Sequence, residues 1–417
     1  MRNTFANFPS QAVSDKEKLS EEYGLEVAKA IKQEWFSDNI GKFSSNLTNF
    51  HKLRLYARGE QSIQKYKDEL SINGDLSYLN LDWKPVPIIP KFVDIVVNGM
   101  ANRSYEINCY SQDQYGVSKR TEHMESILSD MKSRGYNDLI QGLFNMNLYQ
   151  NEKDQLPDTE EELALHMQLN YKQAVEIAEE QALNVLLEGS DYDLIRRRCL
   201  YDLAVLGIGA TKTTFDWADG AKVEYVDPAN IVYSHTESPY FDDIYYIGEV
   251  KEVPINELVK QFPDLTEGEI EDIVERSHDP LVHSPGRDSN KVHVLYFNYK
   301  THSNSVYKLK KVGSGAEKVL EKDEGFNPSQ EQQDQGEFEK LERVLECLYE
   351  GVYVIGADKL LKWRMMPNMM RTSSNFTKVK MNYQVVAPRM YEGRIESLVS
   401  RITGFADMIQ LTHLKLQ

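Results

Sequence analysis

The sequence lacks the features of several large protein classes. No apolar run approaches the ~18 residues that a membrane-spanning helix needs. The first residues, MRNTFANFPSQAVSDKEKL, have no apolar core of the kind found in secretion signals. The three cysteines, Cys109, Cys199 and Cys347, lie far apart and form no CxxC pair. Such cysteine usage indicates a reducing compartment, buried thiols and no structural zinc.

Local motifs of enzyme active sites are also missing. The chain contains no G-x-S-x-G, no HExxH and no Gly-rich phosphate loop. The stretch GIGATKT at 207–213 departs from a Walker loop, because no glycine directly precedes Lys212 and because a predicted helix comes before it. Its glycines are expected to permit a sharp turn. His278 and His283 have no further ligands nearby for a metal. The sequence therefore predicts no catalytic, cofactor-binding or metal site, and a protein that is not an enzyme.

Positive charge is scarce, since the formal net charge is -17. A net negative charge disfavours binding of duplex DNA over the whole protein surface, because such binding depends on Lys and Arg. An acidic wall would suit a conduit along which DNA slides, while acidity that only aids solubility is the simpler explanation and stays open. Within 359–394 the sign reverses, and Glu392 is the only acid there. We interpret this segment as a surface for an acidic partner, either nucleic acid or another subunit, with a solvated basic face as the alternative.

At 417 residues the chain is long enough for two or three domains of roughly 100–200 residues each. The stretch at 223–263, here called the organising stretch because the other predicted elements are placed around it, predicts strand, turn, strand, loop, strand and then a helix that begins at Pro254. Asp227-Pro228 marks the turn, because proline cannot donate a ladder hydrogen bond. Upstream, residues 46–70 predict helix interrupted at Gly59.

A long acidic helix is predicted over 159–188, opened by a capping box of Thr159 and Glu162. A second helix is expected at 191–206, with three consecutive arginines at 196–198. Consecutive helical positions point in different directions. We therefore favour pairing of these arginines with the preceding acidic helix over contact with phosphate.

The last third of the chain is rich in predicted strands. Residues 292–313 predict a hairpin that turns at Ser303-Asn304, and 344–363 predict another that turns at 356–358. Between them lies an acidic, glutamine-rich stretch, 321–346. Residues 393–417 then begin a helix with no C-terminal cap. Either the natural chain continues beyond it or a partner completes it.

Segments of the sequence, taken in order, resemble the portal proteins of tailed bacteriophages, most closely those of crAss-like phages and their podovirus relatives. The resemblance is carried by LPDTEEELALHMQLNYKQAVEIAEEQAL (156–183), VLGIGATKTTF (205–215), the 223–263 stretch, VHVLYFNY (292–299), VLECLYEGVYVIGADKLLKW (344–363) and YEGRIESLVSRITGF (391–405). Together they span most of residues 45–417. The resemblance implies an α+β, portal-like fold with a helical and mixed wing, a β-rich clip and a long stem helix.

The same resemblance divides the chain into regions. It implies an N-terminal arm at 1–45, a wing at 46–280 that contains the helix at 159–188, and a clip region at 281–392 with an insertion at 321–343. The start of a stem helix is expected at 393–417. The crown of portal proteins is expected to be absent from this sequence, and the chain to continue.

For function, the resemblance implies a structural subunit of a ring, a dodecamer, at a unique capsid vertex of the virion. Such a ring is the DNA channel for packaging and ejection, and it is assembled in the host cytoplasm. The implied partners are other copies of the chain, double-stranded DNA passing non-specifically, the major capsid protein, the terminase motor and tail or adaptor proteins. No membrane and no cofactor is expected.

The candidate contacts to a subunit, a partner or DNA are basic residues near the predicted clip and stem: Lys359, Lys362, Arg364, Lys378, Lys380, Arg394, Arg401 and Lys415. Other functions stay open. The protein is alternatively another virion ring or adaptor protein, or, least favoured, a DNA-processing enzyme that uses the basic 359–394 face.

Overall fold

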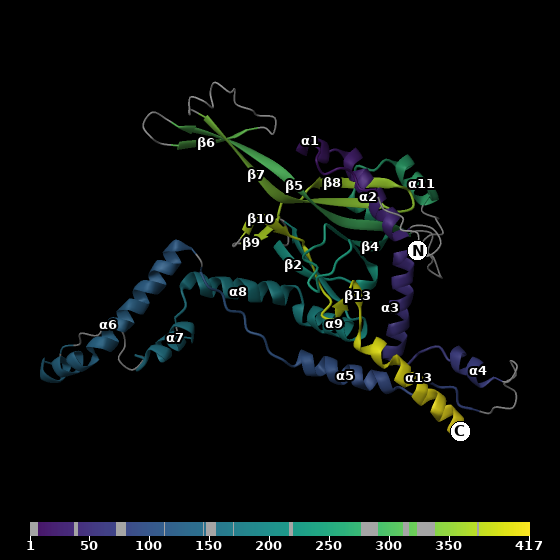
Figure 1. Ribbon diagram of the computed structural model, residues 1–417, viewed down its shortest axis with the longest axis horizontal. Helices are drawn as coiled ribbons and strands as arrows, with labels where there is room; N and C mark the ends of the chain where they lie inside the picture. The colour runs from purple at the N-terminus through teal and green to yellow at the C-terminus, as the bar shows by residue number, and fades with distance from the viewer. Residues whose placement is uncertain are drawn as a thin grey trace. The chain divides into compact units, whose positions relative to one another are not determined.

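A computed structural model describes residues 7–36, 41–71, 81–111, 113–144, 146, 156–169, 171–216, 220–276, 291–311, 317–322, 338–372 and 375–417. They form two compact units (Figure 1). Met1–Asn102 and Asp193–Gln417 make up the main unit, and Arg103–Tyr192 make up the helical unit. Helices and strands are mixed, which confirms the α+β class at that level. No described helix is both long and apolar enough to cross a membrane.

The largest sheet of the main unit is antiparallel, with the order β3-β4-β5-β7-β8 and with β6 paired to β5. Its strands are β3 (Ile231–Tyr233), β4 (Tyr246–Pro254), β5 (Lys291–Lys311), β6 (Glu317–Lys322), β7 (Phe338–Val354) and β8 (Lys359–Met365). In Figure 1, β5 and β7 run alongside each other as a long twisted ribbon.

The predicted turn at Ser303-Asn304 is wrong. β5 continues through it, with Ser303 opposite Leu345 and Asn304 opposite Val344. A polar pair is tolerated in a strand when the partner strand satisfies its backbone groups. Part of the predicted insertion at 321–343 is also strand, because β7 already begins at Phe338, while 323–337 lie outside the described residues. The predicted hairpin turn at 356–358 is confirmed between β7 and β8.

The organising stretch folds as predicted. β2 (Gly220–Tyr225) leads into a turn of 3-10 helix, Pro228–Asn230, followed by β3, β4 and helix α10 (Ile255–Gln261). The Asp227 side chain accepts a hydrogen bond from the Ala229 amide at 3.0 Å and so closes the turn.

A second sheet has the order β11-β1-β2, in which β1 is Gly209–Asp216 and β11 is Tyr383–Val386. The turn before β1 needs glycine, as predicted. Gly207 has φ +83°, and a Cβ there would lie 2.6 Å from the Glu396 carbonyl oxygen.

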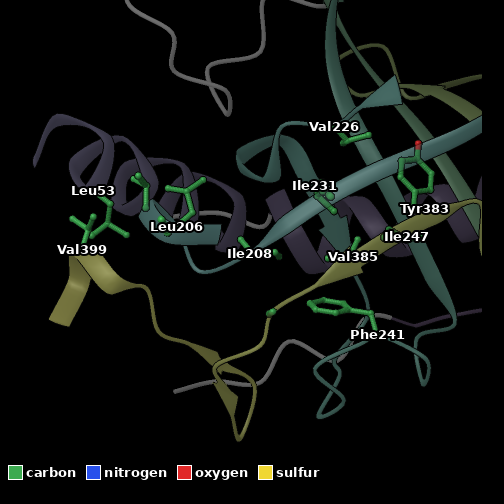
Figure 2. Close-up of a cluster of buried hydrophobic side chains, with 14 of the residues drawn as sticks. Leu53, Leu206, Ile208, Val226, Ile231, Phe241, Ile247, Tyr383, Val385 and Val399 are labelled. Atoms are coloured by element: carbon green, nitrogen blue, oxygen red, sulfur yellow. The ribbon is translucent and has the colours of Figure 1, made fainter. Parts of the chain in front are cut away.

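The hydrophobic core of the main unit joins distant parts of the chain. Figure 2 shows Leu53, Leu206, Val226, Val385 and Val399 in this cluster. They belong to or border helix α3 (Lys42–Arg58), helix α9 (Tyr192–Val205), β2, β11 and helix α13 (Leu398–Leu416). The C-terminal helix is thus packed on both early and central segments.

Helix α2 (Glu21–Phe36) lies against β7 and β8. The Trp35 indole donates to the Tyr233 carbonyl at 3.2 Å and to the Tyr246 hydroxyl at 3.0 Å. The Trp363 indole of β8 donates in turn to the Lys18 carbonyl at 2.8 Å. These bonds attach the described part of the predicted N-terminal arm to the sheet.

Short elements complete the main unit. They are α1 (Asp15–Lys18), α4 (Gln64–Leu70), α5 (Ile88–Ala101), α11 (Glu267–Arg276), β9 (Met370–Thr372), β10 (Asn375–Lys380), β12 (Met390–Tyr391) and β13 (Arg394–Ile395). The predicted helix at 393–417 therefore begins later, at Leu398, where the Ser397 hydroxyl caps it by accepting from the Ser400 amide at 2.9 Å.

The helical unit contains α6 (Gln114–Phe144), α7 (Glu160–Leu169) and α8 (Ala174–Gly189). The single helix predicted over 159–188 is wrong, because it divides before α8. The buried Glu176 carboxylate accepts from the Gln173 amide at 2.9 Å, from the Ser111 amide at 2.8 Å and from Arg120 at 3.0 Å. These bonds satisfy polar groups at the first turn of α8 and so stabilise a separate helix that starts there. The acidic sequence pattern does not indicate this interruption.

Candidate functional site

The predicted basic contacts on β8 are paired with acids. Lys359 Nζ lies 2.6 Å from Glu269 Oε1 on α11. This bond, together with hydrogen bonds from Thr266, lowers the pKa of Glu269 to about 2. Lys362 Nζ lies 2.8 Å from Glu350 Oε1 on β7, and Arg364 hydrogen-bonds the same oxygen. Both acids lie outside 359–394, so the positive segment seen in the sequence is largely neutralised along β8.

Glu350 shows how this pairing works. Partial burial of its carboxyl acts to raise the pKa, but the hydrogen bonds from Lys362 and Arg364 outweigh burial and lower it. The carboxylate therefore stays ionised between two cations. This part of β8 is an ion-pair network in which one acid faces two cations, so one positive charge remains in excess.

The other predicted contacts lie on different elements. Lys378 and Lys380 are on β10, Arg394 is on β13, and Arg401 and Lys415 are on α13. All five are exposed, and none of them forms an ion pair with any residue that the structure describes. They are available to a partner, but the structure does not gather them on one element.

An apolar groove between α5 and α13 was not predicted. It encloses about 290 Å³, and apolar residues alone line it: Ile88, Ile89, Phe92, Val96, Leu398, Ile402, Phe405, Ala406 and Ile409. Phe92 is 55% exposed and Phe405 is 65% exposed. The sequence does contain an indication of this groove, because α5 (IIPKFVDIVVNGMA) is apolar on more than one face. Such helices are usually covered on all sides.

Polar bonds hold α13 in place beside this groove. The Asp407 carboxylate accepts from the Tyr66 hydroxyl at 2.7 Å and from the Tyr56 hydroxyl at 3.0 Å, and Lys65 Nζ lies 2.5 Å away. One turn later, Gln410 accepts from the Val86 amide at 2.8 Å. The helix is therefore anchored on one side, while its Phe405 side faces outward.

The helical unit also exposes apolar side chains. Its buried cluster contains Ile127, Leu156 and Leu163. Large exposed residues line the end of α6 and much of α8: Tyr136, Leu139, Leu143, Phe144, Val175, Ile177, Leu183 and Val185. Large apolar side chains that stay exposed are candidates for contact with a partner.

No three His, Cys, Asp or Glu side chains are placed to hold a metal ion within the described ranges. His278 and His283 lie outside those ranges.

Comparison with protein-family models and with curated proteins finds no match for this chain.

Proposed function

We propose that the chain is a structural subunit of a portal ring, the DNA channel at a unique vertex of a tailed-phage capsid. The proposal is carried by the apolar groove on α13, the helix that the resemblance assigns to the stem. Its lining is wholly apolar and is open along Phe92 and Phe405. In the proposed ring, a second copy of this chain covers the groove.

A ring requires a heterologous interface, in which one surface of a subunit meets a different surface of the next. Full burial of a large apolar side chain contributes about 1.5–3 kcal/mol, so covering the exposed parts of Phe92 and Phe405 supplies roughly 1 kcal/mol each. Association costs about 4–15 kcal/mol, so the groove needs further contacts. The exposed apolar side chains of α6 and α8 are candidates for them.

The charge distribution is compatible with passage of DNA. A net charge of -17 opposes tight binding of the duplex. Exposed cations without ion pairs among the described residues, such as Arg394, Arg401 and Lys415, could contact phosphates briefly. In this proposal the capsid protein, the terminase motor and tail or adaptor proteins dock on the ring in the virion, and the motor supplies the energy.

The proposal is tested by native mass spectrometry and negative-stain microscopy of the intact protein and of two variants. Phe405→Asp places a charge at the open groove and is expected to abolish rings, while the circular dichroism spectrum stays unchanged because Phe405 is mostly exposed. Thr412→Asp is the matched control, since this exposed residue of α13 is not part of the groove lining.

Rings in the wild type and in Thr412→Asp, but not in Phe405→Asp, would support the proposal. A wild-type protein that remains monomeric at every concentration would overturn it. Rings that Phe405→Asp leaves intact would show that the groove is not the subunit contact.

A further inference from the structure

A cleft in the main unit has an arginine-rich lining. It lies where α3, α5, α9 and the turn after β2 meet, and it encloses about 540 Å³. Its arginines are Arg54 and Arg58 of α3 and Arg197 and Arg198 of α9. They gather in a chain whose net charge is -17, so their convergence calls for a physical explanation.

Two of the carboxylates in the lining are already bonded. Arg54 donates to both oxygens of Asp227, at 2.6 and 3.0 Å, and lies 3.5 Å from Asp202. Asp202 also accepts from the Tyr225 hydroxyl at 2.5 Å. Burial raises the pKa of Asp202, while the contacts with Tyr225 and Arg54 act to lower it. These residues place two carboxylates beside one guanidinium at this end of the cleft.

The remaining arginines have no such partners. Arg58 and Arg197 are exposed and form no ion pair with any described residue. Arg198 lies over the Tyr225 ring, with its guanidinium carbon 4.1 Å from the ring centre. That contact can hold a guanidinium in place without using its N–H donors. Asp94 is the one further acid in the lining, which therefore holds four arginines and three acids, with the positive excess at the rim.

We propose that this cleft binds a phosphate group. Guanidinium groups offer paired N–H donors that match phosphate oxygens, and a dianion would relieve repulsion among the three rim arginines. The site is complete within one copy of the chain, so it does not depend on ring formation. The phosphate can be that of a small anion such as pyrophosphate or that of a DNA backbone, because both present the same oxygens.

The test uses isothermal titration calorimetry with pyrophosphate and fluorescence anisotropy with a labelled short DNA duplex, each at two salt concentrations. The main variant is Arg58→Ala combined with Arg197→Ala, both exposed positions whose change should leave the fold intact. Arg343→Ala on β7 is the control, because it removes an exposed guanidinium that does not line the cleft. Arg197→Lys keeps the charge but loses the paired donors.

The wild type and Arg343→Ala are expected to bind one of the two probes saturably. The double variant should bind it at least about tenfold more weakly, the sum of two exposed charge contacts. Arg197→Lys should lie between them. Binding of pyrophosphate would assign the site to small anions, whereas binding of the duplex alone would assign it to the DNA backbone. No saturable binding of either probe, or equal binding by the double variant, would overturn the proposal.

Discussion

Removal of the Asp407 carboxylate is expected to loosen the C-terminal helix α13 from the main unit. Asp407 accepts from Tyr56 and Tyr66, whose side chains are 4% and 1% exposed, so both hydroxyls would lose a partner in a buried setting. Each such bond is worth about 1 kcal/mol net. The ion pair with Lys65 adds at most about 0.5 kcal/mol, because the lysine side chain is 40% exposed. Asp407→Ala should therefore cost about 2–2.5 kcal/mol.

Hydrogen exchange measured by mass spectrometry reports this loss locally. Peptides that cover 398–416 should exchange about 30-fold faster or more in Asp407→Ala, provided that the helix opens as a unit. Glu69→Ala is the control, since it removes an exposed carboxylate of the neighbouring helix α4. Equal exchange of 398–416 in the two variants would refute the anchoring role of Asp407.

Two further predictions concern packing and pH. A Cβ at Gly351 would lie 2.4 Å from the ring of the buried Phe297, so Gly351→Ala should lower stability by about 1–3 kcal/mol in thermal unfolding, whereas Gly404→Ala, with open space around it, should not. An unchanged melting temperature for Gly351→Ala would contradict the sheet packing. The Lys359 bond, together with hydrogen bonds from Thr266, lowers the pKa of Glu269 from 4.5 to about 2. The stability that Glu269 adds over Glu269→Gln should therefore be present above pH 4.5 and decline as the pH falls toward 2; a difference that grows on acidification would refute this pairing.

Features that depend on neighbouring residues in the chain were predicted well. The break at Gly59 is confirmed, because its φ of +75° ends α3 in a conformation that glycine adopts readily. The turn at Asp227-Pro228 and the helix after Pro254 are confirmed for similar reasons. In each case a single glycine or proline determines the local backbone conformation, so the sequence pattern alone is enough to predict the break or the turn.

Features set by distant partners were not predictable. The break before α8 depends on the Glu176 carboxylate, which bonds Ser111 and Arg120 far earlier in the chain. The basic segment 359–394 looked open along the sequence, but Glu269 and Glu350 reach it from other elements. The contacts expected for Arg394, Arg401 and Lys415 stay predictions.

The arginines at 196–198 illustrate the same limit. Their sequence favoured pairing with the preceding acidic helix, whereas Arg198 instead lies over Tyr225, and Arg197 lines a cleft with α3. Contact with phosphate was the less favoured alternative there, and the cleft now makes it the proposal to test.

Direct imaging of the particle tests the central claim most directly. A cryo-electron microscopy map of the unique capsid vertex, interpreted without imposed symmetry, should contain a closed ring of this chain around the DNA, with the groove of α5 and α13 covered by the next subunit. A vertex ring built from a different chain, or this chain elsewhere in the particle, would contradict the account.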